Sequence, residues 1–307
     1  MILMDKIKIA YMGTPLFAKI VLEKLIESYQ VDLVITQPDK EVGRKRLLTP
    51  CPVKELALEN NIEVFQPLKI RNDYQKIIDL QPDLIITCAY GQIVPKEVLE
   101  CPKYGCINVH ASLLPKLRGG APIHKAIIYG YEKTGITIMY MDKGMDTGDM
   151  LLKESIEIDY NDTYGTLYEK LKELGGKLIV KTLKNLEKGE IEREKQSDDF
   201  TMAPMIQKEM GKIDWTKKSE EIRNLIRGFN PTPGAYTNIG EDKMKIWMAE
   251  YTDIVADGVN PGEIVKANSK EGLLIKTGDG VLEITELQMP NLKRMSAKEY
   301  LRGHTLA

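Results

Sequence analysis

Apolar runs of strand length alternate with segments of helical periodicity from Ile7 through Leu186. The apolar runs predict strands at 7–12, 31–36, 62–65, 83–88, 106–110, 135–141 and 150–158. The segments at 15–28, 53–60, 73–80, 124–129 and 163–186 carry apolar residues at helical spacing. Strands that alternate with helices are typical of an α/β fold. We therefore expect a Rossmann-like domain with a mostly parallel sheet and helices on both of its faces.

The pattern of apolar positions changes near residue 208. Residues 188–207 are charged and weakly periodic, which predicts a linker. A helix is expected to begin at Ser219, and short alternating strands follow it at 243–249, 262–267, 272–277 and 281–287. Short, closely spaced strands of this kind predict a small β-barrel like the oligonucleotide-binding fold. The sequence thus predicts an α/β domain at 1–187, a linker at 188–207 and a β domain at 208–307.

Composition narrows the class of protein. The chain is 43% hydrophobic and 29% charged, with a net charge of −2, so any contact with a polyanion requires a local basic patch. No apolar run approaches the roughly 20 residues of a membrane span, and the N-terminus is too short and charged for a signal peptide, so we expect a cytoplasmic protein. Four cysteines without a Cys-x-x-Cys pair predict reduced thiols, and three histidines without ligand spacing predict no metal site.

The candidate chemistry lies in the stretch Gly105–Pro122, which contains Asn108 and His110. Two residues apart on a strand, their side chains leave the same face, at the edge where open α/β sheets bind ligands. A glycine-flanked loop at 142–149 adds Asp146. An amide can donate to a developing oxyanion, an imidazole can hold a proton, and a carboxylate can orient it. These groups fit direct transfer of an acyl-type group between two substrates, although a structural hydrogen-bonded pair remains the alternative.

Two other loops carry information. The turn after the first strand, Gly13-Thr14-Pro15, lacks the G-x-G-x-x-G pattern, which disfavours a dinucleotide-dependent dehydrogenase. A long loop at 37–52 contains Arg44 among four basic residues, and it is either a solvated surface loop or a mobile finger that binds phosphates. The loop at 89–95 follows an apolar strand and is expected at the same sheet edge as His110.

The segments INVHASLLPKLRGGAPI and MDKGMDTGDM closely resemble the formyltransferase family that uses 10-formyltetrahydrofolate. By this resemblance Asn108, His110 and Asp146 match the family's catalytic Asn, His and Asp. The segments KIDWTKKSEEIRNLIRGFNPTPGAY and GDGVLEITELQ are similar to the second domain of the members that act on tRNA. The resemblance implies a catalytic domain, a tRNA-binding domain, and transfer of the formyl group to the α-amine of methionine on initiator tRNA.

The resemblance also implies which residues bind each substrate. The folate pocket would contain Tyr90, Gly91, Gln92, Ile93, Ser112, Leu113, Leu114, Pro115 and Asp142. The basic residues Lys40, Arg44, Lys45 and Arg46 would hold tRNA phosphates. The expected protein is a monomer that needs neither metal nor membrane. Two alternatives stay open: a formyltransferase with the same core that acts on an amino sugar nucleotide, and a non-catalytic protein that binds tRNA or folate on this fold.

Overall fold

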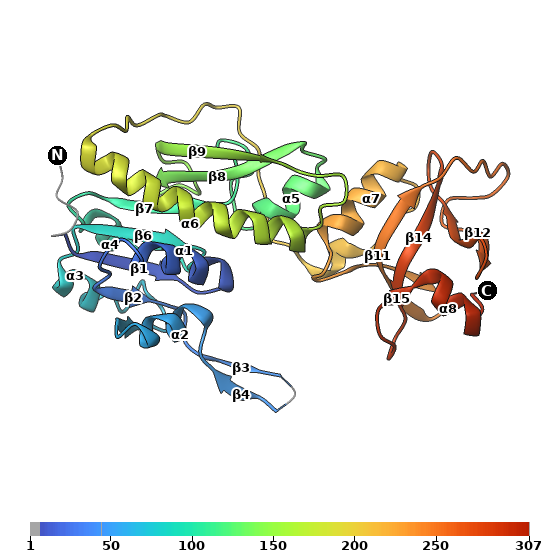
Figure 1. Cartoon of the computed structure of the whole chain (residues 1–307), viewed down its shortest axis with the longest axis horizontal. Coiled ribbons are helices and arrows are strands. Elements are labelled where there is room, and N and C mark those ends of the chain that lie inside the picture. Colours follow the sequence, from blue (N-terminus) through green and yellow to red (C-terminus); the bar gives the residue numbers. More distant parts are fainter. Residues whose placement is uncertain (1–6, 44, 307) are drawn as a thin grey trace. The chain divides into compact units, whose positions relative to one another are not determined.

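The structure is a computed structural model that describes residues 7–43 and 45–306 (Figure 1). The described residues form two compact units, each assembled from segments that are distant in sequence. The first unit draws on Met1–Gly119, Thr134–Ile156 and Tyr168–Met202, and the second on Gly120–Lys133, Glu157–Leu167 and Ala203–Ala307. The domain boundaries expected around the 188–207 segment stay a prediction, because compact units need not coincide with contiguous domains.

A seven-stranded sheet with the order β5-β2-β1-β6-β7-β8-β9 forms the centre of the first unit. Its strands are β1 (Ile9–Gly13), β2 (Leu33–Ile35), β5 (Glu63–Phe65), β6 (Leu84–Cys88), β7 (Cys106–His110), β8 (Lys133–Tyr140) and β9 (Met150–Glu157). The strands from β5 to β7 are parallel to their neighbours, and β8 is antiparallel to β7. The prediction of a mostly parallel sheet is confirmed.

Helices cover both faces of this sheet. They are α1 (Leu16–Ile26), α2 (Pro52–Glu59), α3 (Gln75–Leu80), α4 (Lys96–Glu100) and the long α6 (Tyr164–Lys188). Ile77 of α3 and Val98 of α4 pack in one cluster with Met12 of β1. Gly175 of α6 lies against Val109 of β7 on the opposite face, so close that a Cβ atom there would be 3.2 Å from the valine. Both faces of the central strands are therefore covered, which explains their nearly continuous apolar sequences.

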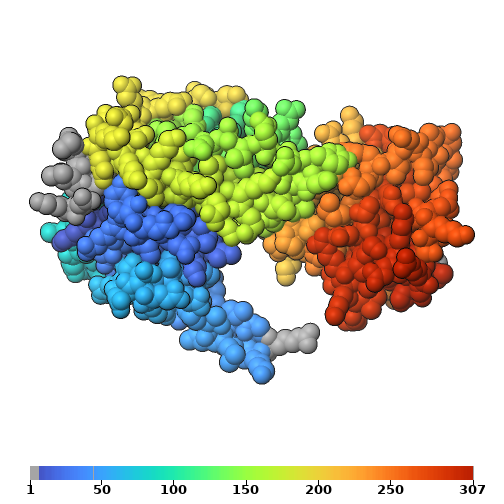
Figure 2. All heavy atoms as spheres, in the orientation of Figure 1, coloured from blue at the N-terminus to red at the C-terminus, as the bar shows by residue number. Residues whose placement is uncertain are grey.

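Residues 37–52 differ from the predicted loop. They contain a β-hairpin of β3 (Lys40–Val42) and β4 (Leu47–Thr49), which pair in a separate two-stranded sheet. Figures 1 and 2 show this hairpin protruding from the rest of the first unit. Val42, Leu47 and Leu48 are 57, 63 and 70% exposed, so neither face of the hairpin is buried. The loop prediction is wrong here because neither face of the hairpin is buried, so its sequence shows no alternation of apolar and polar residues that would indicate strands.

The second unit is built on an antiparallel sheet with the order β10-β11-β14-β13-β12, to which β15 is added beside β14. Its strands are β10 (Ala235–Ile239), β11 (Asp242–Tyr251), β12 (Ile264–Asn268), β13 (Gly272–Lys276), β14 (Val281–Gln288) and β15 (Met295–Ser296). Its helices are α5 (Pro122–Ile128), α7 (Ser219–Gly228) and α8 (Ala297–Gly303), with a 3-10 turn at Lys208–Gly211. The four predicted strands and the helix from Ser219 are confirmed, whereas β10 and β15 were not predicted.

Two predictions about the chain's class can be compared with the structure. All four cysteines are free thiols, as their spacing predicted. Within the described residues, no helix combines the length and apolar character that crossing a membrane requires.

Candidate active site

Strands β6 and β7 bring the predicted residues to one edge of the sheet. Asn108 and His110 lie at the C-terminal end of β7, and their side chains leave the same face of the strand because they are two residues apart. Asn108 is in register with Thr87, the residue before the last residue of β6. The loop that follows β6 therefore starts beside these two side chains, which confirms the expected position of residues 89–95.

The imidazole of His110 is held in one orientation. Its Nε2 atom lies 3.0 Å from the carbonyl oxygen of Leu117, and the side chain is only 5% exposed. Because a carbonyl oxygen can only accept, the hydrogen-bond network assigns a hydrogen to Nε2. Nδ1 is then the nitrogen that can gain or lose a proton, and it faces Asp146 Oδ2 at 3.6 Å. The carboxylate of Asp146 is therefore the acidic group beside the free ring nitrogen of His110.

The carboxylate of Asp146 is held by the loop that also holds His110. Its Oδ2 atom accepts a hydrogen bond of 2.9 Å from the backbone N–H of Gly119, two residues beyond the Leu117 carbonyl. Asp146 itself has a φ of +53°, in the left-handed region that costs a non-glycine residue roughly 1 kcal/mol. The surrounding structure therefore imposes this conformation. The structure brings together all three residues that the sequence nominated.

Thr87 orients the side-chain amide of Asn108. The Thr87 hydroxyl donates a hydrogen bond of 2.8 Å to Asn108 Oδ1, and Thr87 is buried at 3% exposure. With its oxygen engaged in this way, the amide has its Nδ2 donors at the other end, where a substrate oxygen can accept from them. Sequence reasoning missed Thr87. The available signal was a polar residue within the otherwise apolar run of β6.

The loop after β6 contains four of the residues assigned to the folate pocket. Tyr90 is buried, and burial raises the pKa of its hydroxyl to about 12. Its hydroxyl oxygen is buried without a hydrogen-bond partner in the described structure. Gly91 has a φ of +88°, and the Gln92 side-chain oxygen accepts 2.8 Å from the backbone N–H of Ile70. The side chain of Ile93 is 91% exposed, so it is open to a ligand.

The turn at Ser112–Pro115 is held by Thr137 of β8. The Thr137 hydroxyl donates to the carbonyl oxygen of Ser112 at 2.7 Å and accepts from the backbone N–H of Leu114 at 3.1 Å. Thr137 is fully buried, and Leu114 belongs to a small core cluster. This single hydroxyl satisfies two backbone groups of the turn, so the shape of the turn depends on it.

Because the resemblance assigns Ser112–Pro115 to a folate pocket, replacing Thr137 with valine is expected to weaken folate binding. The substitution keeps the branched shape but leaves the Leu114 N–H and the Ser112 carbonyl without a partner, at a cost of about 1–3 kcal/mol in stability. We expect a KM for 10-formyltetrahydrofolate raised about tenfold, since a shift of 1.4 kcal/mol in binding is a factor of ten. Steady-state kinetics and thermal unfolding measure both effects.

Thr134→Val, on the same strand, is the matched control. The Thr134 hydroxyl is buried without a hydrogen-bond partner in the described structure, so its removal should leave the KM unchanged and the fold at least as stable. Equal folate KM values for the two variants would contradict the role assigned to Thr137.

The other predicted residues lie in the loop at 142–149, in the turn after β7 and on the β3–β4 hairpin. Asp142 is exposed, and its Oδ1 accepts from the Gly144 backbone N–H at 2.9 Å and from the Thr147 hydroxyl at 2.7 Å, so it shapes its own loop. The basic residues Lys40, Lys45 and Arg46 are exposed on the hairpin or its turn, whereas Arg44 lies outside the described residues. Leu113 is half-buried beside Leu114.

Two further features carry none of this chemistry. Cys106 is buried on β7, and burial raises the pKa of its thiol, so it does not provide a thiolate nucleophile at neutral pH.

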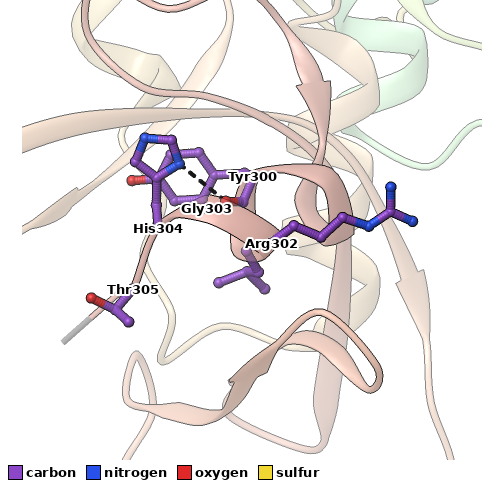
Figure 3. Close-up of a pocket in the computed structure, with 6 residues that line it drawn as sticks. Tyr300, Arg302, Gly303, His304 and Thr305 are labelled. Atoms are coloured by element: carbon purple, nitrogen blue, oxygen red, sulfur yellow. Dashed lines mark hydrogen bonds between the residues drawn. The ribbon is translucent and has the colours of Figure 1, made fainter.

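A pocket near the C-terminal end of the described chain, in the second unit, is lined by the residues Tyr300 to Thr305 (Figure 3). There the His304 ring stacks on Tyr300 with ring centroids 4.5 Å apart. None of the predicted site residues lines that pocket.

Comparisons with known proteins identify relatives along nearly the whole sequence. A family model described as formyl transferase matches residues 6–183, and a model of the formyl transferase C-terminal domain matches residues 205–305. A methionyl-tRNA formyltransferase of Bacillus cytotoxicus is 50% identical over 305 residues, which cover 98% of this chain and 96% of the relative.

Solved structures share the fold. WlaRD, a sugar 3N-formyl transferase studied with dTDP and 5-N-formyl-THF, has a TM-score of 0.68 and 22% identity, covering 94% of this chain and 99% of its own. HypX from Aquifex aeolicus, in complex with tetrahydrofolic acid, has a TM-score of 0.61 and 17% identity, covering 96% of this chain and 47% of its own. At these identities the likeness concerns the fold alone.

Proposed function

The chain belongs to the formyl transferase family, and on that premise we propose that it formylates the α-amine of methionine on initiator tRNA, with 10-formyltetrahydrofolate as the formyl donor. Such a reaction prepares methionyl initiator tRNA for translation initiation. The acceptor is supported by the printed name of a relative that matches this chain at 50% identity over nearly its full length. The reaction joins one-carbon metabolism to protein synthesis. We propose that it takes place in the cytoplasm and that the active protein is a monomer.

One observation carries the chemistry: His110 has Nε2 committed to the Leu117 carbonyl and Nδ1 beside Asp146. This arrangement leaves one ring nitrogen, Nδ1, able to exchange a proton with a reacting group, and a carboxylate lies beside it. The Asn108 amide leaves the same face of β7 with its oxygen engaged by Thr87. Two donors and a carboxylate therefore lie at one strand end, where a reacting carbonyl group needs them.

These residues account for each step of the transfer. A free α-amine has a pKa of about 8, and esterification lowers it, so a large share of the amine is neutral and nucleophilic. Its nitrogen forms a bond to the formyl carbon, and the carbonyl oxygen becomes an oxyanion that accepts from Asn108 Nδ2 and from the protonated Nδ1 of His110. The bond between the formyl carbon and N10 then breaks. N10 gains a proton, the former amine loses one, and Asp146 supports this relay through His110 or a water molecule.

A direct assay tests the assignment. The purified chain is incubated with 10-formyltetrahydrofolate and either methionyl initiator tRNA or a dTDP-linked amino sugar. We expect formylmethionyl-tRNA to form and the sugar nucleotide to remain unmodified. Preferential formylation of the sugar would instead support the alternative acceptor. Binding of both tRNA and folate without turnover would indicate a non-catalytic protein on this fold.

The hairpin is the part of the first unit that we propose for tRNA phosphates. Lys40 and Lys45 are exposed cations on or beside β3, and the Arg46 Nε atom lies 3.9 Å from the Glu41 carboxylate with 82% of the Arg46 side chain exposed. An ion pair this long and exposed contributes little, so Arg46 can exchange it for a phosphate. Arg44 completes the proposed set, and the second unit contributes the remaining contacts.

Replacing Lys45 and Arg46 together with alanine is expected to raise the KM for charged tRNA about tenfold and to leave the KM for folate unchanged. Each lost phosphate contact should also lower the dependence of tRNA binding on salt, by about one unit in the slope of log K against log salt. Filter binding at several salt concentrations measures this slope. Lys103→Ala, an exposed lysine outside the hairpin, is the control. An unchanged KM for tRNA in the double variant would contradict the proposed role of the hairpin.

A further inference from the structure

The segment between Lys188 and Met202, read from sequence as a linker, contacts both loops of the candidate site within the first unit. Glu194 and Met150 exchange two backbone hydrogen bonds of 2.7 and 2.9 Å. The Thr201 hydroxyl accepts 2.9 Å from the backbone N–H of Leu117, the residue whose carbonyl holds His110. The Thr201 carbonyl accepts 2.9 Å from the backbone N–H of Arg118. This segment therefore braces the loop at 117–119 and the end of the loop at 142–149.

Gln196 makes the most specific of these contacts. Its Nε2 atom donates to the carbonyl oxygens of Asp146 and Gly148, both at 2.8 Å. Its Oε1 atom accepts 2.9 Å from Nε of Arg118, which distinguishes the oxygen of this amide from its nitrogen. Both ends of the Gln196 side chain are thus engaged, and the backbone on either side of Thr147 is tied to the loop that carries Leu117 and Gly119.

Arg118, which donates to the Gln196 side chain, is itself held in place by its surroundings. Its side chain is 8% exposed, and its guanidinium carbon lies 4.7 Å from the centroid of the Phe200 ring. A stacked guanidinium has few alternative positions, so its Nε hydrogen points to one place. Asp146 lies within ion-pair range of His110. Arg118 lies on the other loop, the one that follows β7, and Gln196 connects it to the Asp146 loop.

We propose that Gln196 is a positioning residue of the transfer reaction, which holds the Asp146 backbone so that its carboxylate faces His110 Nδ1. Asp146 has a φ of +53°, a conformation that a non-glycine residue keeps only when its surroundings impose it. Gln196 and the Gly119 N–H are the partners on its carbonyl and its carboxylate. Without Gln196, Asp146 can relax toward a commoner backbone conformation, and its carboxylate then turns from the imidazole.

Gln196→Met tests this proposal, because methionine keeps the length and bulk of the side chain and removes both polar ends. We expect kcat to fall about tenfold while the KM values for both substrates stay within twofold, since both polar ends of Gln196 are already bonded to the protein, at the Asp146 and Gly148 carbonyls and at Arg118. Lys195→Ala, an exposed neighbour in the same segment, is the matched control and should match the unsubstituted enzyme. A full kcat in Gln196→Met would overturn the proposal.

A double-mutant cycle separates positioning from a general loss of structure. If Gln196 acts through Asp146, adding Gln196→Met to Asp146→Asn should change kcat by less than twofold beyond Asp146→Asn alone. If the double variant instead lost kcat by the product of the two single-variant factors, Gln196 would act independently of Asp146, and the proposal would be overturned.

A spectroscopic measurement makes the proposal independent of the formylation activity on which its kinetic test rests. The chain contains three histidines, so a carbon–proton spectrum of protein labelled at the histidine Cε1 position has three ring signals, assigned with His→Ala variants. At one fixed pH, the His110 signal in Gln196→Met should move in the same direction as in Asp146→Asn, with His124 and His304 unmoved. An unmoved His110 signal overturns the proposal even if the enzyme is active. If the His110 signal moves but the chain formylates neither substrate, the positioning role of Gln196 is supported and the proposed formyltransferase function is contradicted.

Discussion

Replacing His110 with alanine is expected to lower kcat for formyl transfer by about 10³-fold, since the variant loses both the proton-holding group and one of two donors to the oxyanion. Substrate binding should change little, because only Nε2 of the imidazole is committed, to the Leu117 carbonyl, and Nδ1 donates to the substrate oxygen mainly as its charge develops. The loss should therefore appear in kcat and kcat/KM together. Single-turnover formation of formylmethionyl-tRNA, with enzyme in excess, measures the chemical step directly.

The fold should survive this change. The Leu117 carbonyl loses its partner, which costs about 1–3 kcal/mol, less than the stability of a typical domain. Thermal unfolding checks this expectation. His304→Ala provides the control, since His304 is exposed and belongs to the second unit. Near-normal turnover in His110→Ala would remove His110 from the mechanism, whereas loss of turnover in both variants would indicate a general defect.

The site's central pair was predictable from sequence because its signals are local. An Asn-x-His spacing at the end of an apolar strand places both side chains on one face, and parallel pairing of β6 with β7 brings the next loop beside them. Asp146 could be nominated from its glycine-flanked loop and from the family resemblance. Its 3.6 Å distance from His110 required the structure.

The supporting residues could not be predicted because their partners are distant in sequence. Gln196 lies 50 positions from Asp146 and 78 from Arg118, in a charged segment without periodicity. Thr87 is 21 positions from Asn108, and only the strand register shows that they meet. The apolar run of β6 marks Thr87 as an unusual position but does not identify its partner, and Gln196 has no burial pattern at all, so only long-range packing reveals their roles. The hairpin at β3 and β4 escaped detection for a related reason, because it buries neither face.

Asn108→Asp should cost about 10²–10³-fold in kcat, although it changes only one atom of the side chain. Aspartate keeps an oxygen that can accept from the Thr87 hydroxyl, so the side chain stays oriented as in the unsubstituted enzyme. The Nδ2 donor, however, becomes a carboxylate oxygen, which cannot donate and which repels the developing oxyanion. The same single-turnover assay measures the loss, and a variant that retains turnover within threefold would exclude Asn108 as the oxyanion donor.

The role of Thr87 follows from the same geometry and completes this test. Thr87→Val removes the hydroxyl that holds Asn108 Oδ1, so the amide can rotate and place its oxygen where its nitrogen should be. Because the donor itself remains, we expect a smaller loss, about tenfold in kcat, which corresponds to 1.4 kcal/mol of transition-state stabilisation. Thr87→Ser keeps the hydroxyl and should retain most of the activity. If valine and serine at residue 87 gave the same rate, the orientation of Asn108 would not depend on this hydrogen bond, and the donor assignment would rest on Asn108 alone.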